Sequence, residues 1–94
     1  MIEITIRSFA MIREILGAKS ISFSIHNENE IVTSVLDQLC NKYPSLKSYL
    51  YKDRNFNPEY VIAVNKERLN YDELETIILK PGDELAIIPP AGGG

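Results

Sequence analysis

The chain has 94 residues, of which 45% are hydrophobic and 24% charged, and its 10 basic and 13 acidic residues give a net charge of -3. This length and composition are typical of one globular domain with a single modest core. Lysine and arginine are spread along the chain without the basic stripe that binds phosphates, which excludes nucleic acid as the main partner.

Two segments near the N-terminus alternate apolar and polar residues, as half-buried strands do. They are MIEITIRS at residues 1–8 and SISFSIH at residues 20–26. Between them, FAMIREILG has apolar residues at spacings of three and four and ends at Gly17, a natural helix stop. We therefore expect an extended hairpin whose connection is a short helix or a structured loop.

One long helix is predicted from the segment NENEIVTSVLDQLCNKY at residues 27–43. Its apolar residues recur at spacings of three and four, which places them on a single helical face. Asn29 or Thr33 is the expected cap at its start. Because Pro44 cannot continue a helix, the helix is expected to end near Tyr43.

The second half of the chain predicts shorter elements. SLKSYLYKDRNFNPE at residues 45–59 is expected to hold a short helical turn and then a surface loop. YVIAVN at residues 60–65 is a continuous apolar run, typical of a strand buried on both faces. A turn, a weak strand and a second turn at residues 81–83 follow, and ELAIIP at residues 84–89 is the last strand.

This order of elements predicts an α+β fold, in which one long helix crosses a mixed sheet of four to five strands. The folded domain is expected to span residues 1–89. Residues 90–94 are expected to form a flexible, glycine-rich tail that projects outward from the last strand.

The sequence also predicts the compartment. No apolar run approaches the ~20 residues of a membrane span. The N-terminal segment interleaves charges with apolar residues and has no apolar signal-peptide core. The single cysteine, Cys40, cannot form an internal disulfide, which fits a reducing environment. We therefore expect a cytoplasmic protein without a membrane partner.

The side chains offer no catalytic constellation. His26 stands alone at a strand end, where an exposed residue is expected, and Cys40 lies on the apolar face of the predicted helix, where cysteines are usually inert. One histidine and one cysteine cannot supply four zinc ligands, and no glycine-rich loop forms a phosphate cradle, so no bound metal or cofactor is expected. Two acidic clusters in turn regions are interpreted as solvated surface: Asp72, Glu73 and Glu75, and Asp83 with Glu84.

The C-terminal segment IIPPAGGG holds the remaining chemistry. Pro89 and Pro90 favour extended backbone and carry the chain away from the last strand. Gly92, Gly93 and Gly94 have no side chains, so this thin peptide can enter a narrow tunnel in a partner protein. The α-carboxylate of Gly94 becomes a good electrophile once it is joined to AMP, which indicates a carrier that a partner enzyme activates. The alternative is an inert tail, because terminal glycines also occur in plain disorder.

Four stretches spread over nearly the whole chain resemble the MoaD/ThiS group of ubiquitin-like sulfur carriers. They are FAMIREILG after the first strand, LCNKYP at the end of the helix, VIAVNKE at the central strand, and KPGDELAIIPPAGGG. The last stretch is the most specific, because it joins Gly-Asp-Glu, an apolar strand, Pro-Pro and terminal glycines.

The resemblance implies a ubiquitin-like β-grasp fold and a sulfur-transfer cycle. A MoeB-like adenylating enzyme would use ATP to activate Gly94, and a sulfur donor protein would displace AMP and leave a thiocarboxylate. The tail, with Gly92 and Gly93 as its narrow neck, would then enter the active site of a MoaE-like large subunit. There it would give sulfur to the pterin precursor of molybdenum cofactor. The chain would act as a sulfur-carrying co-substrate, the non-catalytic small subunit of molybdopterin synthase.

The resemblance also assigns partner binding to Phe9 and Ile88, on an apolar docking face, and to Pro89 and Pro90 beside the tail. From the residues alone, Phe9 and Ile88 fit ordinary core positions equally well. Two features depart from the family pattern. A third glycine precedes the usual pair, and Arg68 stands at a position that is often apolar.

Related functions are the alternatives. The loop YKDRNFNPE at residues 51–59 is longer than is usual for MoaD, which admits a protein modifier conjugated to lysines through Gly94, or a sulfur carrier for tRNA thiolation. A carrier for thiamine thiazole ranks lower, because such proteins are usually shorter and lack Pro-Pro. A β-grasp binding module with an inert tail is the alternative without sulfur chemistry.

Overall fold

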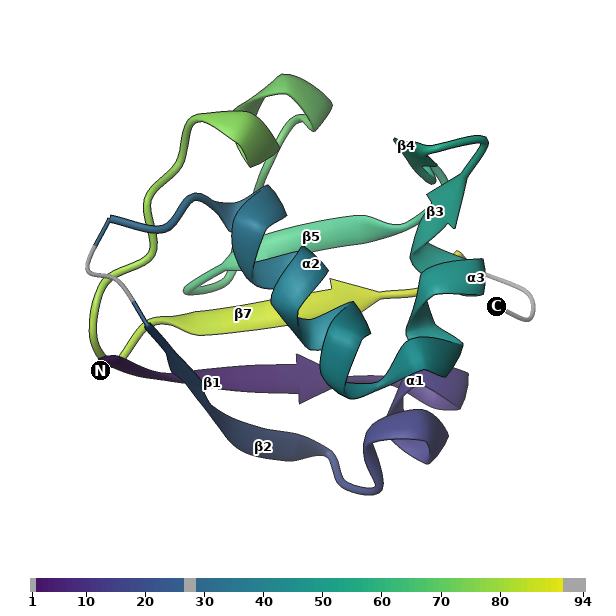
Figure 1. Ribbon diagram of the computed structural model, residues 1–94, viewed down its shortest axis with the longest axis horizontal. Coiled ribbons are helices and arrows are strands. Elements are labelled where there is room, and N and C mark those ends of the chain that lie inside the picture. Colours follow the sequence, from purple (N-terminus) through teal and green to yellow (C-terminus); the bar gives the residue numbers. More distant parts are fainter. Residues whose placement is uncertain (1, 27–28, 91–94) are drawn as a thin grey trace.

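The computed structural model describes residues 2–26 and 29–90. Within them, five strands form one sheet and two further strands form a short ladder (Figure 1). In chain order the elements are β1 (Ile2–Ser8), α1 (Ala10–Leu16), β2 (Ser20–Ile25), α2 (Val32–Lys42), the 3-10 helix η1 (Pro44–Leu46), α3 (Lys47–Leu50), β3 (Tyr51–Lys52), β4 (Asn55–Phe56), β5 (Val61–Val64), β6 (Glu67–Arg68), the 3-10 helix η2 (Tyr71–Glu75) and β7 (Glu84–Ile88).

The main sheet is mixed and has the strand order β2-β1-β7-β5-β6. Strand β1 pairs antiparallel with β2 and parallel with β7, and β7 pairs antiparallel with β5. The first and last strands of the chain therefore lie side by side within the sheet (Figure 1). This arrangement confirms the predicted α+β fold, the N-terminal hairpin and a mixed sheet of the predicted size.

Helix α2 crosses one face of the sheet and supplies a large part of the core (Figure 1). Its buried side chains lie on a single helical face, as predicted: Val32, Val35, Leu36, Leu39 and Cys40. The same core cluster contains the inward-facing residues of the central strands, among them Ile4, Ile6, Leu85 and Ile87. Each fully buried aliphatic side chain contributes about 1.5–3 kcal/mol, so this layer is the main source of stability.

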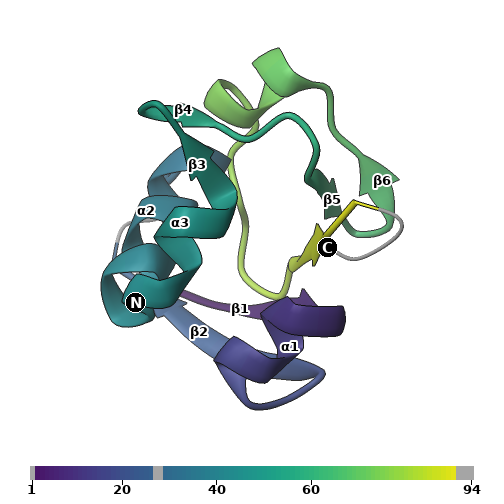
Figure 2. The ribbon, with the colours of Figure 1, turned by 90° about the vertical axis from the view of Figure 1, so that its right-hand side faces the viewer.

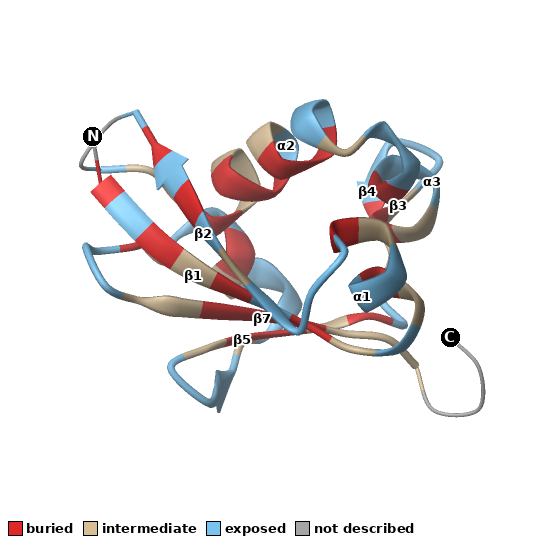
Figure 3. Cartoon of the chain, turned by 90° about the horizontal axis from the view of Figure 1, so that it is seen from below, coloured by how far each residue is buried: buried red, intermediate tan, exposed pale blue. Residues whose placement is uncertain are grey.

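The two faces of the sheet differ in burial. Along β1, Ile4 and Ile6 are buried, whereas Glu3 and Arg7 are exposed, and Figure 3 shows this alternation as bands along the strand. Helices α2 and α3 lie on the side of the buried residues, the inner face (Figure 2). The opposite side is the outer face, and it carries the side chains that alternate with the core residues.

Helix α2 begins later than predicted. Residue 31 is its N-cap and makes no side-chain cap hydrogen bond, so the expected caps, Asn29 and Thr33, are wrong. The reason is tertiary, because the segment before the helix pairs with a distant one. Ile31 forms an antiparallel bridge with Ile78, and the N–H of Leu79 donates to the carbonyl of residue 30 at 3.0 Å. The end of the helix is as predicted, at Lys42 with Tyr43 as C-cap.

Two predictions in the second half need correction. The predicted surface loop contains a hairpin, β3–β4, which turns at Asp53 and Arg54, both with positive φ, and is anchored by the buried Phe56. Strand β5 is shorter than predicted and only partly buried: Ile62 and Ala63, on opposite faces, are buried, whereas Val61 and Val64 at its ends remain partly exposed. An apolar run does not reveal whether anything packs on its second face.

Candidate functional site

The outer face carries an apolar row at the end of the sheet where β7 leads into the C-terminal segment. Val61 and Ile88 are direct partners across β5 and β7. In the parallel pair β1–β7, Ser8 lies beside Ile87, and the residues that follow them are Phe9 and Ile88. Because successive side chains alternate between faces, Phe9, Ile88 and Val61 lie together on the outer face. These three residues are called the apolar row.

The members of the apolar row are half-buried, and none belongs to the core cluster. Phe9 has extended backbone, with φ -136° and ψ 153°, so the alternation of β1 continues through it up to the start of α1. The guanidinium carbon of Arg7 lies 5.7 Å from the centroid of the Phe9 ring, within the range of a cation–π contact. Phe9 and Ile88 are therefore not ordinary core residues.

A second row of the outer face contains small side chains between two cations. Ala63 and Ala86 are direct partners, with Arg7 beside Ala86 on one side and Arg68 beside Ala63 on the other. Arg7 also lies 3.8 Å from a carboxylate oxygen of Glu84, an exposed pair that is worth little for stability. The two alanines allow close approach of a partner, and Arg68 adds a positive charge at the rim of this surface.

The chain leaves the sheet directly from the apolar row. The two prolines that follow Ile88 are half-buried, and they end the described part of the chain. The tail residues Gly92, Gly93 and Gly94, which the sequence assigns to the chemistry, lie outside the described residues, as does most of the predicted flexible tail. The described geometry therefore concerns the surface from which the tail emerges.

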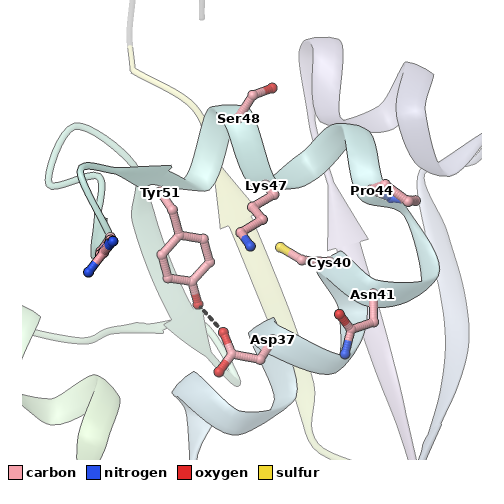
Figure 4. Close-up of a pocket in the computed structure, with 8 residues that line it drawn as sticks. Asp37, Cys40, Asn41, Pro44, Lys47, Ser48 and Tyr51 are labelled. Atoms are coloured by element: carbon pink, nitrogen blue, oxygen red, sulfur yellow. Dashed lines mark hydrogen bonds between the residues drawn. The ribbon is translucent and has the colours of Figure 1, made fainter.

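Cys40 is 6% exposed and lies on α2 at an open pocket of about 680 Å³, which residues of α2, η1 and α3 line together with Tyr51 and Arg54 (Figure 4). Burial, and the nearby charge of Asp37, raise the pKa of the Cys40 thiol to about 11, although Lys47 opposes the shift. The Tyr51 hydroxyl donates to Asp37 at 2.8 Å, and burial together with this hydrogen bond raises the pKa of Tyr51. A thiol with so high a pKa is protonated at neutral pH, which supports a structural interpretation of Cys40.

The other sequence candidates have structural explanations. His26 is exposed at the end of β2, as expected. Glu73 and Asn70 form a capping box at η2, and Asp83 accepts a hydrogen bond from the backbone N–H of Lys80 at 2.7 Å. Among residues 2–26 and 29–90, no three His, Cys, Asp or Glu side chains lie close enough together to hold a metal ion. None of the helices in the described part of the chain has the length and apolar character to cross a membrane.

Sequence reasoning missed three contributors to the outer face: Val61, Ala63 and Arg7. Val61 and Ala63 were hidden in an apolar run that was interpreted as wholly buried. A stricter reading of alternation within that run, with Ile62 on the inner face, would have placed them outward. Arg7 was placed only on the polar side of a strand. Its contact with Phe9 was missed because that contact depends on the backbone direction after β1.

The chain is similar to known proteins over nearly its whole length. The model of the ThiS family matches residues 6–94. The chain is 32% identical over 93 residues to small archaeal modifier protein 3 of Haloferax volcanii, which covers 98% of this chain and 99% of the relative. It is 32% identical over 94 residues to the molybdopterin synthase sulfur carrier subunit of Anopheles gambiae, with 99% and 93% covered.

Among solved structures, the crystal structure of SAMP1 from Haloferax volcanii matches with a TM-score of 0.83 and 25% identity, over 98% of this chain and 99% of that one. This match confirms the ubiquitin-like β-grasp fold that the resemblance implied. The family match extends over nearly the whole chain, including the apolar row and the C-terminal glycines. The chain therefore belongs to the ThiS family, in the MoaD/ThiS group of ubiquitin-like sulfur carriers.

Proposed function

We propose that this protein carries sulfur as a thiocarboxylate on Gly94 and donates it to the pterin precursor of molybdenum cofactor. The observation that carries the proposal is the position of the apolar row beside the end of β7, where the chain leaves the sheet. A partner that binds this row receives the tail at a fixed place. Whole-length similarity to a molybdopterin synthase sulfur carrier subunit supports the pterin pathway.

The proposed chemistry needs no catalytic side chain from this protein. A carboxylate oxygen of Gly94 attacks the α-phosphate of ATP on the adenylating enzyme, pyrophosphate leaves, and an acyl adenylate forms. A persulfide on the donor protein attacks the acyl carbon, and AMP departs with the electron pair of the broken C–O bond. A second thiol then takes the donor's inner sulfur as a disulfide, leaving the terminal sulfur on Gly94 as the thiocarboxylate. The chain binds no cofactor, and ATP belongs to the partner.

The outer face explains how a thin tail is aimed. Ordering several glycines costs conformational entropy, so the tail alone is a weak ligand. Docking of Phe9 and Ile88 into an apolar surface of the partner supplies a central contact, and the half-buried prolines hold the start of the tail. The partners in this proposal are a MoaE-like large subunit, a MoeB-like adenylating enzyme and a sulfur donor protein. They would meet the protein in the cytoplasm, consistent with its single, buried cysteine.

Intact-mass measurement tests the sulfur-carrier proposal. The protein is incubated with a MoeB-type adenylating enzyme, ATP and sulfide, and its mass is then compared with that of an ATP-free control. We expect the mass of one oxygen to be replaced by that of one sulfur, at Gly94. An unchanged mass, with an enzyme that demonstrably forms adenylate on another carrier, would contradict the proposal.

A protein modifier is the second candidate, and the similarity to small archaeal modifier protein 3 over nearly the whole of both chains favours it. The same acyl adenylate would then react with a lysine amine and form an isopeptide bond through Gly94. Recovery of the protein from cells distinguishes the two functions. Free thiocarboxylate supports the sulfur carrier, and lysine conjugates that contain the C-terminal glycines support the modifier.

A further inference from the structure

Strand β2 is an edge of the main sheet, paired on one side with β1. The backbone N–H of Ser8 donates to the carbonyl of Lys19 at 2.9 Å, so these two residues form a hydrogen-bonded antiparallel pair. Such pairs alternate along an antiparallel ladder with pairs that exchange no hydrogen bond. The N–H and C=O groups of Ser20, Ser22 and Ser24 therefore point away from β1, toward the free edge.

The hydrogen bonds on the other side of β1 indicate the same alternation. The N–H of Thr5 donates to the carbonyl of Asp83, and the N–H of Gly82 donates to the carbonyl of Glu3, both at 2.9 Å. Glu3 and Thr5 thus point their backbone groups toward β7, and their partners across β2, Ser24 and Ser22, point theirs outward. Within the described residues, no strand pairs with this outward edge.

Within Ser20–Ile25, the edge lacks the features that normally prevent pairing with another chain. Such edges are usually protected by lysine, proline, a bulge or a covering element. Strand β2 has the sequence SISFSI, without a charge or a proline, and its register with β1 is uninterrupted over six residues. The residues whose backbone groups point toward the free edge are serines. Their side chains are small, so an added strand meets no bulky side chain there. This edge is therefore open to β-sheet addition.

A trough of about 620 Å³ runs along the same edge, between β2 and α2. Phe23 of β2 lies on one side of it, and Gln38, Asn41 and Lys42 of α2 lie on the other. The Lys42 ammonium lies 5.8 Å from the centroid of the Phe23 ring, so the cation is held beside the strand. Alternate side chains of an added strand would enter this trough.

The charge of the trough selects the kind of strand. Among residues 2–26 and 29–90, the ionisable groups that line it are Lys42 and His26, without a carboxylate, although the chain as a whole is acidic. Two neighbouring carboxylates, which do not themselves line the trough, are hydrogen-bonded to residues that do. Glu3 accepts a hydrogen bond from the hydroxyl of Ser22, and Glu30 accepts one from Gln38. A strand whose trough-facing side chains are acidic complements this surface.

Self-pairing of β2 is disfavoured by the same charge. If two copies of the protein paired through β2, the two antiparallel strands would be related by a twofold axis perpendicular to the sheet. Both copies of α2 would then lie on the same face of the joined sheet. The Lys42 side chains, each held beside Phe23 in the middle of β2, would then face each other across the joint. Like charges at such a joint oppose the dimer.

We propose that the free edge of β2 and the adjoining trough bind an extended acidic peptide segment of another protein as an additional antiparallel strand. The outward groups of Ser22 and Ser24 supply the main-chain hydrogen bonds, and Lys42 selects carboxylates. Strand β1 separates β2 from β7, from which the tail emerges, so the site is distinct from the apolar row. A second protein can therefore be held while a partner engages the tail.

Titration of the full-length, 15N-labelled protein with a defined probe tests the proposal. The probe is the blocked heptapeptide Thr-Glu-Thr-Glu-Thr-Glu-Thr, and its matched control replaces each Glu with Lys. We expect saturable shifts of the amide signals of Ser22, Ser24 and Lys42 with the acidic peptide, and binding at least tenfold weaker with the basic one. The amides of Ser22 and Ser24 should also exchange more slowly with solvent when the acidic peptide is bound.

Two pairs of variants locate the site. Ser22→Pro removes an outward N–H without breaking the ladder to β1, and Ser22→Ala, its control, loses the same hydroxyl but keeps the N–H. Lys42→Glu reverses the charge in the trough, and Lys52→Glu makes the same change on the exposed β3 strand. We expect at least a tenfold loss of affinity for Ser22→Pro and Lys42→Glu, and less than a twofold change for both controls. If Ser22→Pro does not fold, the comparison of Lys42→Glu with Lys52→Glu tests the location of the binding site.

Three results would overturn the proposal. One is the absence of saturable shifts on β2 at millimolar acidic peptide. Another is equal binding of the acidic and basic peptides, or shifts confined to the outer face around Phe9. The last is concentration-dependent dimerisation of the protein alone that Ser22→Pro abolishes, which would make a second copy of this chain the occupant of the edge.

Discussion

Strand β7 shows the difference between the two faces of this sheet. On the inner face, Leu85 and Ile87 are completely buried. On the outer face, Ala86 is 8% exposed between Arg7 and Ala63, and Ile88 is half-buried at the surface. Alternate residues of one strand thus serve two purposes. An apolar residue in β7 stabilises the fold if its side chain lies on the inner face, and it forms part of the surface if its side chain lies on the outer face.

The comparison suggests a division of labour between the faces. Removing an inner-face side chain leaves a cavity in a packed core, whereas removing an outer-face side chain changes a surface that a partner would cover. Stability and partner binding should therefore respond to different substitutions. The four predictions below are ordered from the largest expected effect to the smallest.

Ile87→Ala tests the inner face. The side chain is completely buried, so its truncation should lower the free energy of unfolding by about 3 kcal/mol. Urea denaturation followed by circular dichroism measures this change. Ile88→Ala is the matched control on the neighbouring residue, and it should cost less than about 1 kcal/mol, as surface truncations do. Equal losses for the two variants would contradict the assignment of faces.

Phe9→Lys tests the outer face. It should leave the melting temperature nearly unchanged, because Phe9 lies outside the core cluster. Binding to the large subunit and to the adenylating enzyme, measured by calorimetry, should weaken by about 2 kcal/mol or more if Phe9 is a hot-spot residue. An unfolded variant would show that Phe9 is needed for the core after all, and unchanged binding would place the docking surface elsewhere.

Cys40→Ala tests the lone thiol, which lies beside the inner face. A small cavity should lower the free energy of unfolding by about 1 kcal/mol, while sulfur loading at Gly94 is retained. Because the pKa of the Cys40 thiol is raised to about 11 from 9.0, the folded state favours the protonated form. This contribution is complete below pH 9 and is lost as the pH rises toward 11.

Alkylation with iodoacetamide provides the measurement for the thiol. At pH 8 the native protein should react much more slowly than the protein unfolded in urea, and the native rate should increase steeply as the pH rises above 9. A fast native reaction at pH 8, or loss of sulfur transfer in a well-folded Cys40→Ala variant, would instead make Cys40 part of a sulfur relay.

Deletion of Gly93 and Gly94 should have the smallest effect on stability. The glycines carry no apolar side chain, so the free energy of unfolding should change by less than about 0.5 kcal/mol. Thiocarboxylate formation, measured by intact mass, should nevertheless disappear. A truncated protein that melts at a clearly lower temperature would show that the tail packs against the body.

Local patterns determined much of this protein. Alternation of apolar and polar residues at residues 1–8 and 20–26 identified β1 and β2, and the spacing of apolar residues identified α2 and its buried face. Both were predictable because strand and helix periods are properties of neighbouring residues. Gly17 ends α1 in the left-handed conformation, as its freedom from a Cβ predicts. The chemistry assigned to the tail also came from local residues, and it stays a prediction.

Tertiary structure decided the rest, because the chain's long-range pairings leave no local signature. The pairing of residues 30–32 with residues 77–79 delays the start of α2, and no pattern within the helix predicts it. The apolar row requires β7 to lie between β1 and β5, which brings Phe9, Ile88 and Val61 together from distant parts of the sequence. Likewise, the free edge of β2 exists only because the sheet ends there. Periodicity predicts which side of a strand is apolar, whereas only the order of the strands determines what lies beside it.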